Sequence, residues 1–192
     1  MATRTALAGE TRTLELRPAT REAVAGMGEL ISIEDDDATL PTAFYEGTVR
    51  VYTPSTFVSD EDTHITLCSI DRRPASVTWM ERHFKHTQVF IPLAGKPFVM
   101  VLAPPTPDGD APDLDSAQAF LFDGSAGFQL AIGTWHEFPF ALVDDTQVVV
   151  ILRSEATKNL LKDASDGGEA HGPDLDKKNI VARTGVTLEW RV

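Results

Sequence analysis

The chain has 192 residues, of which 42% are hydrophobic, and this content suffices to build the core of one ordinary domain without cross-links. Its 17 basic against 29 acidic residues give a net charge of −12, which disfavours nucleic acid and anionic membrane surfaces as partners. The single cysteine, Cys68, excludes an intramolecular disulfide, and no signal peptide or apolar membrane span is visible, so we expect a cytoplasmic protein.

Polar, aperiodic residues over 1–13 predict a flexible amino-terminal arm, followed by a single domain over 14–192. A short helix is predicted to begin near Thr20, whose hydroxyl is a suitable cap for the run REAVAGMGEL. It should end near Gly26 or Gly28. The acidic run IEDDDATLPT that follows predicts a loop, because adjacent carboxylates repel and proline lacks a backbone donor.

Strand signals dominate the rest of the chain. Short β-branched and aromatic runs, separated by turn residues, predict strands over 49–53, 63–70, 76–83, 88–93, 97–103, 117–122, 128–132, 147–153 and 184–192. The Pro- and Gly-rich segment 104–113 predicts a surface loop, and 155–183 a polar insertion or lid with a helical turn or two. This pattern favours a mainly all-β fold, an antiparallel sandwich or barrel.

One predicted strand carries several groups that are costly to bury. Glu81 and His83 lie two residues apart and should share a face of the strand. Gln88 follows in the next strand, and GTWHEFP brings His136. One carboxylate, two imidazoles and one carboxamide suit a divalent cation such as Ni, Fe, Mn or Zn. We expect these four residues to be metal ligands.

The spacing of these residues resembles the two motifs of the cupins. The first motif, H-x-H-x(3,4)-E-x(6)-G, is matched by Glu81, His83, Gln88 and Gly95, with Glu for the first His and Gln for the Glu. The second, P-x-G-x-x-H, is matched by Gly133 and His136 without the proline. The phrases ERH…QVFIPLAGKPF, GTWHEFPFAL and TREAVAGMGELI are similar to those of the ureidoglycolate lyase family, from about residue 14 to about residue 153.

This resemblance implies a cupin double-stranded β-helix, or jelly-roll barrel, that acts as a homodimer with a divalent metal, usually nickel. The implied reaction is cleavage of ureidoglycolate to glyoxylate and urea, a step of purine and allantoin catabolism. Two features depart from the family: Glu137 stands where a second histidine is common, and 155–183 finds no match. Both bear on the substrate, since pocket residues and lids change when a scaffold takes a new one.

The remaining roles concern a 2-hydroxy acid whose hydroxyl must lose a proton and whose urea nitrogen must gain one. Candidate proton carriers are Glu81 and Glu137. Candidate cations for the substrate carboxylate are Lys96, Arg72 and Arg82, since a guanidinium meets a carboxylate with two hydrogen bonds. Trp135 is expected to wall the pocket against water.

Other interpretations use the same residues. Two histidines and one carboxylate are also the ligand set of nonhaem Fe(II) dioxygenases. A third possibility is a non-catalytic cupin that binds a small acid, with weak metal binding or none. His64, His86 and His171 lack supporting spacing and are expected to be solvated.

Overall fold

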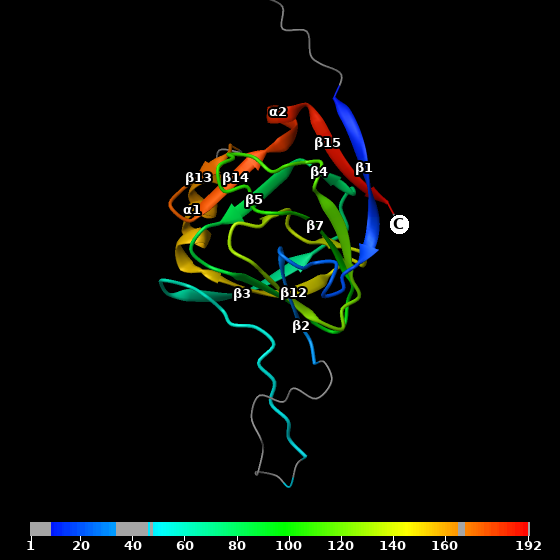
Figure 1. The fold of residues 1–192 in the computed structure, drawn as a ribbon, viewed down its shortest axis with the longest axis vertical. Coiled ribbons are helices and arrows are strands. Elements are labelled where there is room, and N and C mark those ends of the chain that lie inside the picture. Colours follow the sequence, from blue (N-terminus) through cyan, green and yellow to red (C-terminus); the bar gives the residue numbers. More distant parts are fainter. Residues whose placement is uncertain (1–8, 34–45, 47, 165–167, 192) are drawn as a thin grey trace, which may run out of the picture.

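The structure is a computed structural model that describes residues 9–33, 46, 48–164 and 168–191 (Figure 1). Within these ranges the strands form two curved sheets. The larger sheet has the order β13 (Ala170–His171), β14 (Leu175–Asn179), β5 (Trp79–His83), β10 (Trp135–His136), β7 (Phe98–Ala103), β8 (Gln118–Phe122), β1 (Glu10–Pro18), β15 (Val186–Arg191) and β4 (Ser76–Val77), with β11 (Phe140–Ala141) paired to β7. The smaller has the order β2 (Gly28–Ile31), β9 (Gly127–Leu130), β6 (Gln88–Pro92), β12 (Thr146–Arg153) and β3 (Thr63–Ile70).

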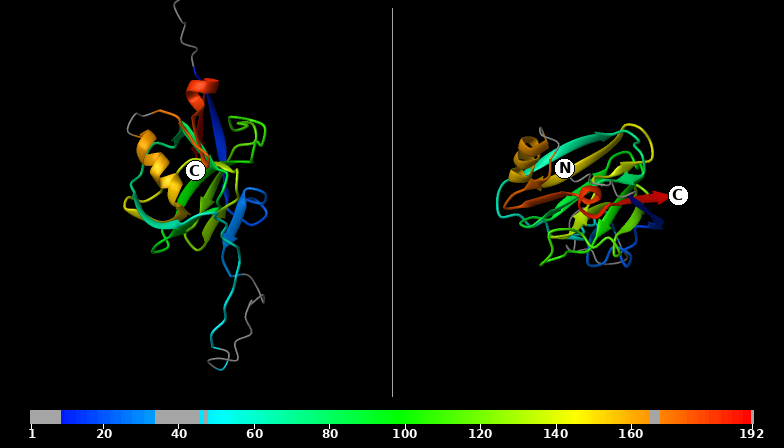
Figure 2. Two further views of the ribbon diagram at one scale, coloured as in Figure 1. Left: turned by 90° about the vertical axis from the view of Figure 1, so that its left-hand side faces the viewer. Right: turned by 90° about the horizontal axis from the view of Figure 1, so that it is seen from above.

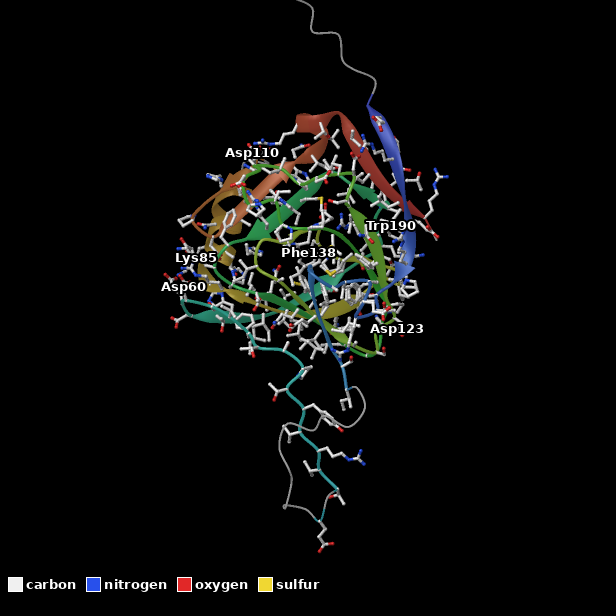
Figure 3. The ribbon with its side chains drawn as sticks, viewed as in Figure 1. Asp60, Lys85, Asp110, Asp123, Phe138 and Trp190 are labelled. Atoms are coloured by element: carbon white, nitrogen blue, oxygen red, sulfur yellow. The ribbon has the colours of Figure 1, made fainter. Side chains whose placement is uncertain are left out.

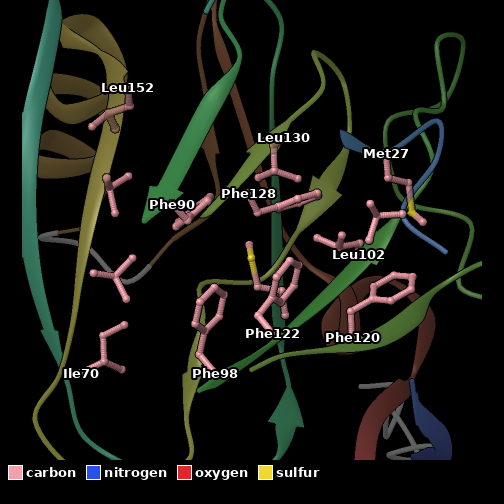
Figure 4. Packing of buried hydrophobic residues seen from close by; sticks show 14 of the residues in the cluster. Met27, Ile70, Phe90, Phe98, Leu102, Phe120, Phe122, Phe128, Leu130 and Leu152 are labelled. Carbon is pink, nitrogen blue, oxygen red and sulfur yellow. The ribbon is translucent and has the colours of Figure 1, made fainter. Parts of the chain in front are cut away.

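The main hydrophobic core lies between these two sheets (Figure 4). Along β12, Val148, Val150 and Leu152 are buried and alternate with partly exposed residues, as expected for a strand with one face on a core. Phe98 and Phe122 stack with ring centroids 4.9 Å apart. Each such side chain stabilises the fold by roughly 1.5–3 kcal/mol relative to an exposed one. The predicted mainly β jelly-roll fold is confirmed.

The predicted amino-terminal helix is wrong. Residues 21–27 form consecutive turns, with the Val24 amide bonded to the Thr20 carbonyl and the Thr20 hydroxyl accepting from the Ala23 amide. The turns end because Gly26 has φ +80° and β2 begins at Gly28, where a Cβ would lie 2.3 Å from the Gln129 carbonyl oxygen. The cap was recognised correctly, but the chain continues as a strand.

Two further expectations near the amino terminus need correction. The arm expected over 1–13 is a strand from Glu10, because β1 runs parallel to both β15 and β8; residues 1–8 lie outside the described residues. The expected strand over 49–53 is absent from the described residues, where Val51 forms a single bridge and remains exposed. Most of the acidic loop expected over 33–42 also lies outside those residues. Composition alone could not show which of these two segments pairs with a neighbouring strand.

The described residues of the segment 155–183 are part of the folded body. The segment contains most of α1 (Ser154–Ala164), β13, β14 and most of α2 (Ile180–Thr184). β14 pairs along its whole length with β5, and Leu175 is fully buried. Figure 2 shows α1 beside the barrel, where it contacts β12 and β13. The lid interpretation is therefore corrected: this segment extends the larger sheet. Among the described residues, no helix has the length and apolar character needed to cross a membrane.

Candidate metal centre

Three neighbouring strands bring the candidate residues together. In the larger sheet β5 lies between β10 and β14, and Glu81 is directly opposite His136 on one side and Lys177 on the other. Directly opposed residues share a face of the sheet, and His83 lies two residues farther along that face. The sheet therefore places a carboxylate among two imidazoles and an ammonium. Phe138, two residues after His136, is labelled in Figure 3 and lies near the middle of the barrel in that view.

The distances confirm a compact cluster. Glu81 Oε1 lies 3.5 Å from His136 Nε2 and 4.0 Å from His83 Nε2. Its other oxygen, Oε2, accepts a hydrogen bond of 2.9 Å from Lys177 Nζ. The side chains of Glu81, His83 and His136 are all at least nine-tenths buried. One oxygen of Glu81 is thus held by the ammonium, while the other faces the two imidazoles.

These residues fit a divalent cation. Four buried atoms have no hydrogen-bond partner within the described residues: both ring nitrogens of His83, Nε2 of His136 and Oε1 of Gln88. Leaving such atoms unpaired costs about 1–3 kcal/mol each, so an ion that pairs several of them is favoured. His136 Nδ1 lies 3.2 Å from the Thr134 carbonyl; a carbonyl only accepts, so Nδ1 carries the proton and Nε2 keeps its lone pair. Ligand atoms of Glu81, His83 and His136 lie within 4.8 Å of one another.

A second group, His83, His86 and Asp174, also has ligand atoms within 4.8 Å of one another and could hold a cation. The prediction that His86 is solvated is wrong, because it is buried and its Nδ1 lies 2.9 Å from Asp174 Oδ2. Asp174 Oδ1 accepts from the Lys85 and Phe84 amides, and the Arg153 guanidinium lies 3.8 Å from Oδ2. A cation here would face that guanidinium and compete for a paired carboxylate, so the Glu81 group is the better site.

The two glutamates near the centre have pKa values shifted in opposite directions. Burial would raise the pKa of Glu81, but the nearby His136 imidazole and the charge of Lys177 outweigh it, and the pKa is lowered. Burial raises the pKa of Glu137, against the opposing charges of Arg73 and Lys177. Glu81 therefore stays ionised, whereas Glu137 is the group better able to carry a proton.

The buried imidazole predicts an acid-sensitive fold. Burial lowers the pKa of His83 to about 3 although the charge of Glu81 opposes it, while an unfolded chain has the ordinary value near 6.5. The unfolded state therefore binds the His83 proton more tightly than the folded state does. The contribution of neutral His83 to the free energy of unfolding is present above pH 6.5 and is lost as the pH falls toward 3.

Metal-stripped wild-type protein should therefore lose up to about 1.4 kcal/mol of unfolding free energy per pH unit more than His83→Asn does over this window. Urea denaturation at several pH values between 4.5 and 7.5 measures the two slopes. His64→Asn, at an exposed position of β3, is the matched control and should keep the wild-type slope. Equal slopes for wild type and His83→Asn would contradict the expectation.

Two of the cations expected at the substrate carboxylate lie elsewhere. Lys96 binds the backbone carbonyls of Asp144 and Asp145 at an exposed turn. Arg72 forms two hydrogen bonds to the Asp144 carboxylate on the same surface. Neither belongs to the cluster around Glu81. A lysine after a turn glycine is ordinarily a solvated turn residue, and that simpler interpretation fits Lys96.

Arg82 and Trp135 lie on the opposite face of the sheet from Glu81 and His136, as strand alternation requires. Arg82 is buried, donates to Asp176 Oδ2 at 3.0 Å and binds the carbonyls of Thr106 and Gly109. Its guanidinium stacks 4.3 Å from the Trp135 ring. The pair therefore holds the 104–113 loop instead of contacting the cluster.

Three residues that sequence reasoning missed approach the cluster. Lys177 contacts Glu81, and Arg73 Nη2 lies 3.3 Å from Glu137 Oε1. The ring of Phe90 meets His136 edge-on, with centroids 6.2 Å apart, so Phe90 lies beside the cluster where Trp135 was expected. Phe90 and Gln88 share the inner face of β6, so Gln88 stays a predicted ligand. Arg73 was within reach of sequence analysis, as the neighbour of Arg72. Lys177 carried no local signal, because its place depends on a long-range strand pairing.

The two sheets and the buried His, His and Glu side chains inside them define a cupin with a centre suited to a metal. A family model described as ureidoglycolate lyase matches residues 11–168. Ureidoglycolate lyase of Azotobacter vinelandii is 35% identical over 155 residues, covering 77% of this chain and 89% of that protein. Its counterpart from Pseudomonas paraeruginosa is 32% identical over 154 residues, covering 77% and 88%. The chain belongs to the ureidoglycolate lyase family.

Among solved structures, RmlC from Streptococcus suis in complex with dTDP-D-xylose overlaps 76% of this chain and 72% of its own. The TM-score is 0.33 and the identity 12%.

Proposed function

We propose that this protein is a ureidoglycolate lyase, a carbon–nitrogen lyase that releases glyoxylate and urea from ureidoglycolate and depends on a divalent cation. The observation that carries the proposal is the cluster of Glu81, His83 and His136 in a chain of this family, with three buried histidine nitrogens that find no hydrogen-bond partner among the described residues. The mixed oxygen and nitrogen donors suit nickel, the metal that the family resemblance implies, and also manganese, iron or zinc.

Glu81, His83 and His136 would hold the cation, with Gln88 as a further candidate ligand. When bound, the cation would lower the pKa of a substrate hydroxyl and polarise it. Glu81 suits the holding role because its pKa is lowered and it stays a carboxylate. Phe90, edge-on to His136, keeps water away from this side of the site.

Glu137 is the proposed proton carrier. Its carboxylate takes the proton of the substrate hydroxyl, the electron pair forms the aldehyde C=O, and the carbon–nitrogen bond breaks. The same proton passes from Glu137 to the urea nitrogen, so no net proton or water is consumed. A raised pKa favours a group that must accept and return a proton near neutral pH. Arg73, 3.3 Å from Glu137, orients the carboxyl group.

Product analysis tests the reaction class. A lyase gives glyoxylate and urea in equal amounts and consumes no oxygen, whereas hydrolysis of the urea group would give ammonia. Oxygen uptake on substrate with Fe(II) would favour the dioxygenase alternative. Organic-acid binding by metal-free protein, with no product under any metal, would favour the binding module.

We further propose that the protein is cytoplasmic and works as a homodimer that pairs through the outer face of β3, β12 and β6. Apolar side chains that are at least partly exposed gather on this face: Ile65, Leu67, Ile91, Val149 and Ile151. Water-exposed apolar sheet faces of this kind mark association surfaces. The lone cysteine, Cys68, agrees with a reducing compartment.

Leu67→Asp should convert the dimer into a monomer, because two buried carboxylates would oppose each other across a twofold axis. Sedimentation velocity at micromolar concentration measures this change. Thr13→Asp, at an exposed position of β1 in the other sheet, is the matched control and should leave the dimer intact. A wild-type monomer, or a Leu67→Asp variant that stays dimeric, would contradict the proposed interface.

A further inference from the structure

We propose that Lys177 of β14 binds the carboxylate of the substrate and thereby selects an acid over a neutral analogue. This inference rests on the proposed function, since it names the group that recognises the substrate of that same centre. The family model ends at residue 168, so Lys177 lies beyond the part of the chain that it matches.

An anionic substrate needs a local cation here. The whole chain carries a charge of −12, and two carboxylates, Glu81 and Glu137, lie at the centre. A small acid would be repelled by both unless a positive group faces it. A metal ion bound by Glu81, His83 and His136 is one such group, and a second is needed to fix the orientation of a bound acid.

The cations near the centre differ in the groups that they contact. Arg73 is bound to the Phe138 carbonyl at 2.6 Å and to Glu137, and its guanidinium lies over the Phe140 ring. Arg82 points to the other face of the sheet. Within the described part of the chain, Lys177 makes a hydrogen bond only to Glu81 Oε2. An ammonium has three N–H donors, so two remain.

Lys177 is also more exposed than the carboxylate it contacts. Its side chain is 30% exposed, whereas the Glu81 side chain beside it is 6% exposed. Of these two contacting side chains, Lys177 is therefore the one that reaches solvent. Antiparallel pairing of β14 with β5 fixes this position, because Lys177 stands directly opposite Glu81 while its neighbours Asp176 and Lys178 pair with each other on the opposite face.

Substitution of Lys177 should therefore affect metal and acid binding differently from substitution of a residue that only positions Glu81. With a divalent cation at Glu81, the ammonium is a nearby like charge, and an acid placed between the two positive groups relieves their repulsion. Removing the ammonium should weaken binding of an acid without weakening binding of the metal. A residue that only positions Glu81 would show the reverse, a loss of metal affinity with equal losses for acidic and neutral ligands.

The test uses two probes of nearly equal size, glycolate and its neutral amide, glycolamide. Isothermal titration of the nickel-loaded full chain should show that Lys177→Met weakens glycolate binding about 10- to 100-fold, the range for a hydrogen bond to a charged group, and changes glycolamide binding less than about twofold. Nickel affinity should be equal or higher. Lys177→Arg should restore most of the glycolate binding, and Lys158→Met, at an exposed position of α1, should match wild type.

Three results would overturn the inference: glycolate binding unchanged in Lys177→Met, equal loss for both probes together with loss of nickel, or no preference of the wild-type chain for glycolate. Glyoxylate release from ureidoglycolate, measured on the same wild-type sample, separates this inference from the proposed function. Release with no effect of Lys177→Met on the Michaelis constant would leave the lyase and remove the role of Lys177. Selectivity for glycolate without release of glyoxylate would keep the role of Lys177 and remove the proposed lyase activity.

Discussion

Glu81→Ala is expected to abolish nickel binding and to lower kcat/KM by at least about 10³-fold, while the fold is retained. The substitution removes the carboxylate that lies between His83 and His136 and the only negative charge of the ligand set. Two neutral imidazoles and a carboxamide hold a borderline divalent cation much less tightly. His136→Ala should have the same two effects. Metal content after desalting and steady-state glyoxylate release measure them together.

Glu15→Ala, at an exposed position of β1, is the control for loss of a carboxylate and should behave as wild type. Far-UV circular dichroism and the melting temperature check that each variant is folded. Activity that survives in both Glu81→Ala and His136→Ala would refute the centre, whatever metal is bound.

Deletion of 163–178 is expected to unfold the protein or to lower its stability by more than about 5 kcal/mol, a large part of the roughly 5–15 kcal/mol of an ordinary domain. The deletion removes β13 and most of β14 and leaves the edge of β5 unpaired. It also removes Leu175, which is fully buried, and Asp176, which pairs with the buried Arg82 at 3.0 Å. An unpaired buried charge alone costs about 3–5 kcal/mol.

Urea denaturation followed by circular dichroism measures this loss. A single substitution tests the same packing more gently: Leu175→Ala should cost about 2–5 kcal/mol, whereas Ile33→Ala, at a largely exposed site, should cost less than about 0.5 kcal/mol. A deletion variant with an unchanged melting temperature and a higher Michaelis constant would restore the lid interpretation.

Sequence reasoning picked out three residues that the structure brings together, Glu81, His83 and His136, from local signals. Alternation in a strand predicted that Glu81 and His83 share a face, and the histidine of GTWHEFP is brought opposite Glu81 by the pairing of β10 with β5. The run of predicted strands from 63 to 153 matches the structure for the same reason, since β-branched residues and turn glycines act within a few positions.

The errors concern contacts that no local pattern encodes. β1 is polar on its exposed face and pairs in parallel with two strands distant in sequence, so it was indistinguishable from a loose arm. β14 has the sequence LDKKN, which lacks β-branched residues, and it is a strand because β5 offers it an edge. Because β14 was not predicted, Lys177 and the buried environment of His86 were missed. The binding of the substrate carboxylate was assigned instead to lysine and arginine residues that lie elsewhere or on the opposite face of the sheet.

The most direct test of the account is glyoxylate release from racemic ureidoglycolate by chelator-treated protein, before and after reloading with nickel. We predict negligible release from the stripped protein, restored release with nickel, and an end point near half conversion, because a fixed cation and a fixed ammonium bind one configuration at the reacting carbon. Release that is undiminished by the chelator, or none with nickel, manganese, iron or zinc, would contradict a metal-dependent lyase centred on Glu81, His83 and His136.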